Sequence, residues 1–127
     1  MIKSIYFENE ELKLKSSAAT PILFRQMFKV DLLKSIIQMK SIDKDSVMED
    51  GEGLEFLDFI KELAFIMNVE ATVPSTEVFQ KLNMETYLAF LLSFDEQIFT
   101  SNSAQIIKVW TGSSAGMSEQ KNAVNPQ

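Results

Sequence analysis

The side chains that carry most enzyme chemistry are missing from this sequence. Its 127 residues include no His and no Cys, so the chain has no imidazole base, no thiol nucleophile and no usual set of zinc ligands. An enzyme built from it would have to use carboxylates, a Ser–Lys pair or a bound cofactor. The carboxylates fall on expected polar helix faces and in an acidic stretch, where hydration explains them. We therefore predict a protein that is not an enzyme and has no catalytic residues.

Neither a cofactor nor a metal is expected. The sequence contains no GxxxxGK[ST] loop and no GxGxxG fingerprint. Residues 41–53 have the acidic composition of a calcium loop, but a loop opening at Asp43 would place Val47 at a ligand position and Met48 where the turn glycine belongs. A solvated connection explains this stretch better, because its acidic side chains precede the N-terminus of the next helix, which carries a partial positive charge. The four glycines lie where linkers are expected: Gly51, Gly53, Gly112 and Gly116.

The composition is that of one globular domain without affinity for nucleic acid. The length and the 46% apolar fraction suit a single hydrophobic core. A net charge of -6, with twelve scattered basic residues, argues against phosphate binding. The opening residues have no apolar run typical of a signal peptide, and no segment has the roughly 20 apolar residues of a membrane helix. The expected compartment is a cytoplasm.

The apolar periodicity predicts a mainly α (α+β) fold: a small helical domain of about five helices with a short N-terminal β-hairpin. Alternation up to Phe7 and again up to Leu14 indicates the hairpin. Helices are expected over 20–28, 31–40, 54–68 and 75–94, the last as one bent or two short helices, and again from residue 103. Residues 69–74 are expected to be extended, and 97–102 to be a polar connection.

Four side chains are expected to cap these helices, although an earlier start at Ser16 or Ser17 stays open for the first. The expected caps are Thr20 (followed by Pro21), Asp31, Ser75 and Asn83. The folded domain should cover residues 1–111, and residues 112–127, which lack periodicity, should form a disordered tail.

The stretch 54–68 is the expected centre of the fold, because its apolar side chains spread over about half of a helix circumference. Phe65 departs from that pattern and projects near Asp58, Lys61 and Glu62. Either a loop or flanking helix covers this ring, which is the interpretation we favour, or it contacts a partner. Trp110, the sole tryptophan, is expected to close the core, with partner binding as the alternative. The candidate partner-binding residues are Phe65, Lys61, Arg25 and Trp110.

Several segments, taken in order, make the chain similar to the tail assembly chaperone family of long-tailed phages and prophages of Gram-positive hosts. The likeness spans most of residues 3–112. Two differences stand out, since the family often has a glycine in the turn at Lys29-Val30 and a tyrosine where this chain has Phe24 and Phe65. The segments are the N-terminal hairpin leading into Ser16-Ser17-Ala18-Ala19-Thr20-Pro21, Leu23-Phe24-Arg25-Gln26-Met27-Phe28, Asp31-Leu32-Leu33, Leu63-Ala64-Phe65-Ile66-Met67, Tyr87-Leu88 and Val109-Trp110.

This resemblance implies an assembly factor of the host bacterial cytoplasm, absent from the mature virion, that coats the hydrophobic tape measure protein and keeps it soluble. It also implies a contact with tail tube subunits, through a longer form made by ribosomal frameshifting and attached after Trp110. Self-association stays open, because a domain that lines a long helix can repeat along it. No nucleic-acid or membrane partner is expected. Two other classes remain: another phage morphogenesis protein, such as a head–tail completion factor, and a non-phage helical adaptor or regulator.

Overall fold

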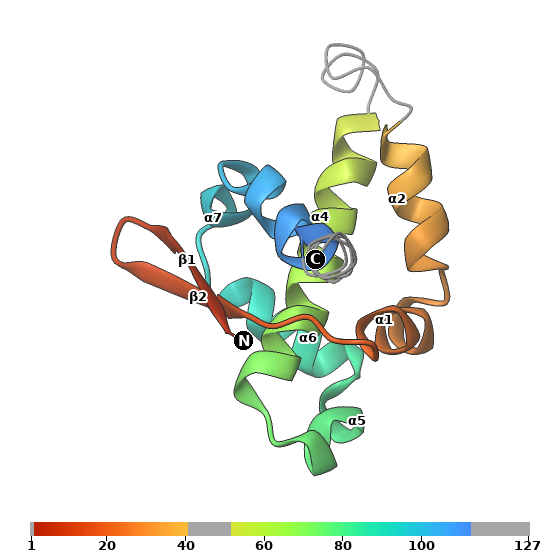
Figure 1. Cartoon of the computed structure of the whole chain (residues 1–127). Coiled ribbons are helices and arrows are strands. Elements are labelled where there is room, and N and C mark those ends of the chain that lie inside the picture. Colours follow the sequence, from red (N-terminus) through yellow and green to blue (C-terminus); the bar gives the residue numbers. More distant parts are fainter. Residues whose placement is uncertain (1, 41–51, 113–127) are drawn as a thin grey trace, which may run out of the picture.

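The computed structural model describes residues 2–40 and 52–112, and it is mainly helical with a two-stranded antiparallel hairpin at its N-terminus (Figure 1). This confirms the predicted fold class. Residues 103–112 form a final helix. The other elements are, in order, β1 (Lys3–Phe7), β2 (Glu10–Leu14), α1 (Thr20–Phe28), α2 (Leu32–Lys40), α4 (Glu52–Thr72), the 3-10 turn η1 (Ser75–Glu77), α5 (Val78–Lys81), α6 (Met84–Leu92) and α7 (Glu96–Thr100).

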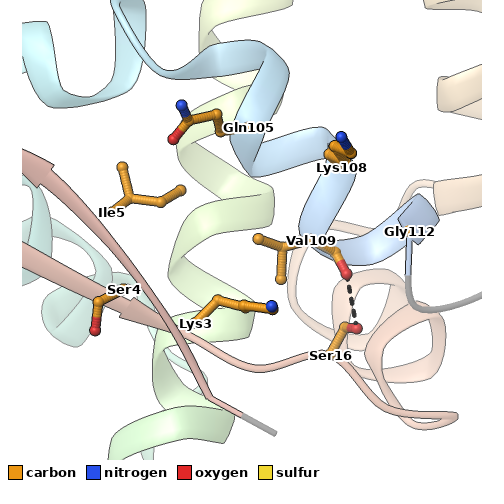
Figure 2. Close-up of a pocket in the computed structure, with 8 residues that line it drawn as sticks. All are labelled: Lys3, Ser4, Ile5, Ser16, Gln105, Lys108, Val109 and Gly112. Atoms are coloured by element: carbon orange, nitrogen blue, oxygen red, sulfur yellow. Dashed lines mark hydrogen bonds between the residues drawn. The ribbon is translucent and has the colours of Figure 1, made fainter. Parts of the chain in front are cut away.

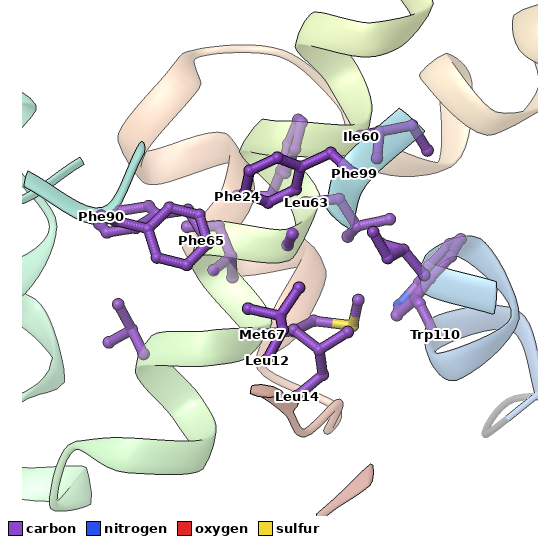
Figure 3. Close-up of a cluster of buried hydrophobic side chains, with 14 of the residues drawn as sticks. Leu12, Leu14, Phe24, Ile60, Leu63, Phe65, Met67, Phe90, Phe99 and Trp110 are labelled. Carbon is purple, nitrogen blue, oxygen red and sulfur yellow. The ribbon is translucent and has the colours of Figure 1, made fainter. Parts of the chain in front are cut away.

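The long helix α4 is the centre of the fold, as the apolar pattern predicted. It runs through the middle of the molecule and contacts β2, α1, α5, α6 and α7 (Figure 1). Its side chains from Leu63 to Met67 are all buried. A helix apolar around so much of its circumference has to be covered on several sides, which is what these neighbours do (Figure 3).

The hairpin packs on α4 through the apolar side chains of one face, because an isolated two-stranded hairpin is marginal in water. Ile5 pairs with Leu12 across the strands, and both side chains are buried. The chain leaving β2 is tied to α4 by hydrogen bonds, since the Lys15 amide donates to the Met67 carbonyl (3.0 Å) and the Asn68 amide group donates to the Lys13 carbonyl (2.9 Å).

The start of α1 is held by a carboxylate of α4 and not by its own cap. Thr20 was expected to cap this helix, but it is the first residue of α1, it is fully buried, and no side chain caps the N-terminus. Its hydroxyl donates to one oxygen of Glu70 (2.5 Å), and the hydroxyl of Ser17 donates to the other (2.5 Å). Burial is the largest influence on Glu70 and raises the pKa of its carboxyl, against the lowering effect of these two hydrogen bonds.

The expected caps at Asp31 and Asn83 are confirmed. The Lys34 amide donates to Asp31 (3.0 Å), and the Thr86 amide donates to Asn83 (2.8 Å). Ser75 does not cap, because it lies inside the η1 turn. The turn between α1 and α2 is made by Lys29 in the left-handed conformation (φ 63°), a geometry that glycine adopts more easily.

Three other expectations about helix boundaries were wrong or incomplete. Residues 69–72 continue α4, because Pro74 restricts only the residue before it and Val69 adds to the buried face. The stretch 75–94 holds two short helices, α5 and α6, and not one bent helix. The connection expected at 97–102 contains α7, capped by Asp95, which accepts from the Gln97 amide (2.8 Å).

Parts of two predicted segments lie outside the described residues. These are positions 41–51 of the acidic connection and positions 113–127 of the expected tail. At their inner borders, residues 52 and 53 already belong to α4, and residue 112 still belongs to the last helix. Among the helices of the described ranges, none has the length and apolarity needed to cross a lipid bilayer.

Candidate partner-binding surface

The four residues predicted to bind a partner do not come together in one surface. Phe65 is 1% exposed, and its ring packs against that of Tyr87, with 5.1 Å between centroids. It also packs against Phe90, at 5.5 Å (Figure 3), and both partners belong to α6. The covering helix that we favoured is therefore present. The expectation that Phe65 contacts a partner was wrong for this conformation, because α6 covers the side on which its ring projects.

The other three predicted residues also have separate environments. Trp110 is buried in the core, as expected by default for the sole tryptophan. Lys61 forms an ion pair with Glu96 of α7, with 2.6 Å between Nζ and Oε1. Arg25 is exposed on α1. Of the four, Arg25 alone combines exposure with a charge that no described acidic side chain pairs with.

The outer face of α6 is an apolar feature that sequence reasoning missed. At about 100° per residue, Met84, Leu88 and Leu92 fall within roughly 80° of the helix circumference. Their exposed fractions are 56%, 50% and 87%. Glu85 is the only charged residue of the helix. We call Met84, Leu88 and Leu92 the α6 stripe. The sequence indicated this stripe only indirectly, through a helix that is apolar on nearly all sides. One neighbouring element could not bury all of those sides.

The inner face of α6 fixes the orientation of this stripe. Tyr87 and Phe90 are buried, and their rings contact Phe28, Phe65, Phe94 and Phe99 at centroid distances of 5.1 to 5.7 Å. The N-terminus is capped by Asn83, and at the C-terminus the Ser93 hydroxyl donates to the Ala89 carbonyl (2.8 Å). Because both ends and one side are held, the α6 stripe is presented without a rearrangement of the core.

A second apolar surface lies on α1 and α2. Leu33 and Ile37, four residues apart on α2, are both well exposed, and Ile22 of α1 and Val30 of the connecting turn are exposed as well. Lys34 and Lys29 are exposed beside them in the sequence. Asp31 is exposed in the same turn, so charges of both signs border this surface, with a positive excess that the α6 stripe lacks.

The surroundings of α6 along the chain are acidic. Residues 75–100 contain Glu77, Glu85, Asp95 and Glu96 against a single basic residue, Lys81. Lys61 compensates Glu96 through their ion pair. The remaining excess is negative, in keeping with the net charge of -6 for the whole chain. A partner bound at the α6 stripe would therefore meet an apolar surface inside a negative field.

Two carboxylates of α4 lie near the buried ring of Tyr87. Burial, and then the neighbouring charge of Asp58, raise the pKa of Glu62 to about 7. Burial is also the main reason that the pKa of the Tyr87 hydroxyl is raised, with smaller effects from Glu62 and Asp58. The charge of Glu62 therefore changes near neutral pH.

An open depression of about 490 Å³ lies between β1 and the final helix (Figure 2). Lys3 and Lys108 give it positive charge, and none of its lining residues is a carboxylate. The Ser16 hydroxyl donates to the Val109 carbonyl (3.1 Å), and the Ser4 hydroxyl donates to Glu11 (2.6 Å). Within residues 2–40 and 52–112, no cluster of three His, Cys, Asp or Glu side chains could hold a metal ion.

Comparisons with protein-family models, with curated proteins and with solved structures find no match for this chain. The likeness to tail assembly chaperones therefore rests on the sequence segments alone.

Proposed function

We propose that this protein is a tail assembly chaperone of a phage or prophage, which binds the tape measure protein and keeps it soluble in the host cytoplasm until the tail tube forms around it. The observation that carries the proposal is the α6 stripe, three exposed apolar side chains on a rigidly held helix of an acidic domain. The similarity of residues 3–112 to that family supports it.

The physical basis is the masking of apolar helices on the partner. Covering an exposed Leu or Met contributes about 1.5–3 kcal/mol at most, so one α6 stripe gives a weak contact after the costs of association. A long tape measure protein offers many such contacts. Several copies bound along it, or a copy linked to tube subunits, would turn weak contacts into a stable complex through effective concentration.

The proposal includes a second partner, the tail tube protein, reached through a longer form of the chain made by frameshifting. Trp110 lies near the end of the described residues, and such an extension would attach after it. The core of residues 2–40 and 52–112 would then be the part shared by both forms, and it would contact the tape measure protein in each.

The test is co-expression with the tape measure protein of the same genome. We expect the chain to raise the soluble yield of that protein and to be retained with it in a pulldown, while an unrelated acidic helical protein does neither. The absence of binding by both the short form and any extended form would overturn the proposal.

Mass spectrometry of purified virions tests the distinction from a structural phage protein. We expect the chain to be absent from mature particles, because a chaperone leaves when the tube closes. Its presence in stoichiometric amounts would favour a head–tail completion role. A genome without a neighbouring tail tube gene and a very long tape measure gene would favour the non-phage adaptor.

A further inference from the structure

The α6 stripe lacks a cover among the described residues, although the opposite face of the same helix is tightly packed. The helix is about 13 Å long, and Met84, Leu88 and Leu92 follow one another at intervals of four residues along it. An apolar row of this spacing matches a facing helix with its own apolar side chains at i, i+3 and i+4. The shape of the surface therefore favours a helical occupant.

The remaining parts of this chain do not have the composition to be that occupant. Residues 113–127 contain only Ala115, Met117, Ala123 and Val124 as apolar residues, without helical spacing. Residues 41–51 include four acidic side chains and one lysine, so they would bring negative charge to an already negative region. Neither sequence supplies an apolar row that complements the stripe.

A second copy of the chain is also a poor occupant. At about 25 cal/mol per Å², the transfer energies of Leu and Met correspond to roughly 100 Å² each, so two facing stripes would bury on the order of 600 Å². Stable interfaces bury about 1,200–2,000 Å². Each copy also carries a net charge of -6, and the symmetric pair would place two acidic regions side by side. The charge disfavours this pairing, and an area of this size holds a complex together only where other contacts add to it, as along a long partner.

We propose that the α6 stripe binds an amphipathic partner helix whose apolar row is flanked by Lys and Arg. The negative charges along the chain on both sides of the stripe, at Glu77, Glu85 and Asp95, outnumber the single positive charge of Lys81. They therefore attract basic flanks and repel acidic ones. This inference rests on the proposed function and deepens it, because it selects which helices of a tape measure protein the chain would cover. The surface of Leu33 and Ile37 on α2, with its excess of positive charge, should bind such a helix less tightly.

Two synthetic peptides of about 21 residues test the charge requirement. Both carry the same leucine row, one flanked by lysines and the other by glutamates, and their binding to the full chain is measured by calorimetry. We expect the lysine peptide to bind about tenfold more tightly or better, because like charges across an interface are unfavourable. Equal binding of both peptides, or no binding of the lysine peptide, would overturn the inference.

Matched variants test the location. Leu92→Glu and Leu88→Glu place a charge on the stripe, and Leu33→Glu places the same charge on the exposed side of α2. Thermal melts should be similar for all three, because each residue is at least half exposed. Binding of the lysine peptide should weaken about tenfold or more for the α6 variants and stay within about twofold for Leu33→Glu. A larger loss for Leu33→Glu than for the α6 variants would refute the assignment.

The other outcomes separate this inference from the proposed function. If the wild-type chain solubilises the tape measure protein and both α6 variants do so equally well, the function stands and the α6 assignment fails. If the lysine peptide binds as expected but the tape measure protein is neither bound nor solubilised, the binding site stands and the function fails. A wild-type dimer in sedimentation equilibrium that Leu92→Glu abolishes would make a second copy the occupant and overturn the inference.

Discussion

Replacing Phe65 by alanine should remove a large part of the folding free energy of this domain. The ring is 1% exposed and lies between α4 and α6, with Tyr87 at 5.1 Å, Phe90 at 5.5 Å and Phe28 at 6.5 Å between ring centroids. Truncating a buried Phe to Ala costs about 3–5 kcal/mol through lost transfer energy and the cavity left behind. Three ring contacts support a loss of about 4 kcal/mol, in the middle of that range.

The loss can be measured by urea denaturation, with circular dichroism for the helices and the fluorescence of the buried Trp110 for the core. Phe65→Leu, which keeps most of the volume but loses the ring contacts, should cost about 1–2 kcal/mol. Phe65→Asp should abolish the folding transition, because it buries a charge.

Phe79→Ala is the matched control, since it deletes the same ring where 66% of the residue is exposed. It should change the unfolding free energy by no more than about 0.5 kcal/mol. A loss below about 1 kcal/mol for Phe65→Ala, or equal losses at both positions, would show that α6 does not pack over Phe65 and would refute the reasoning.

Three further predictions concern single side chains. Lys29→Gly should raise the free energy of unfolding by about 0.5–1 kcal/mol, because Lys29 ends α1 in the left-handed conformation, where a Cβ is unfavourable; a decrease in urea melts would count against it. Glu70→Ala should cost about 1–3 kcal/mol, because it leaves the hydroxyls of Ser17 and the buried Thr20 without an acceptor, whereas the exposed Glu77→Ala should be close to neutral in the same melts. Glu62, whose pKa is raised to about 7 from 4.5, holds its proton more tightly in the folded than in the unfolded state, so stability should fall as the pH rises through that window. Glu62→Gln should remove roughly 1 kcal/mol of this fall after allowance for screening at a half-buried site, and identical pH profiles of thermal melts for both proteins would refute the assignment.

The sequence by itself determined the local structure wherever a pattern or a cap acts over a few residues. Alternation at Ile5 to Phe7 and at Leu12 to Leu14 was sufficient for the hairpin, and Asp31 and Asn83 marked helix starts that the structure has. The apolar circumference of residues 54–68 was sufficient to place α4 at the centre. These features follow from backbone geometry and short-range hydrogen bonds, which do not depend on distant parts of the chain.

Contacts between residues far apart in the chain were decided only by the tertiary structure. Thr20 has the chemistry of a cap, yet its hydroxyl binds Glu70, fifty residues away. Phe65 projects toward charged neighbours on its own helix, and only the position of α6 makes it a core residue. The same packing selects Tyr87 and Phe90 as the inner face of α6 and leaves Met84, Leu88 and Leu92 outside. A helix apolar on nearly all sides carries no internal signal for which side is buried, because that choice depends on the neighbour against which it packs.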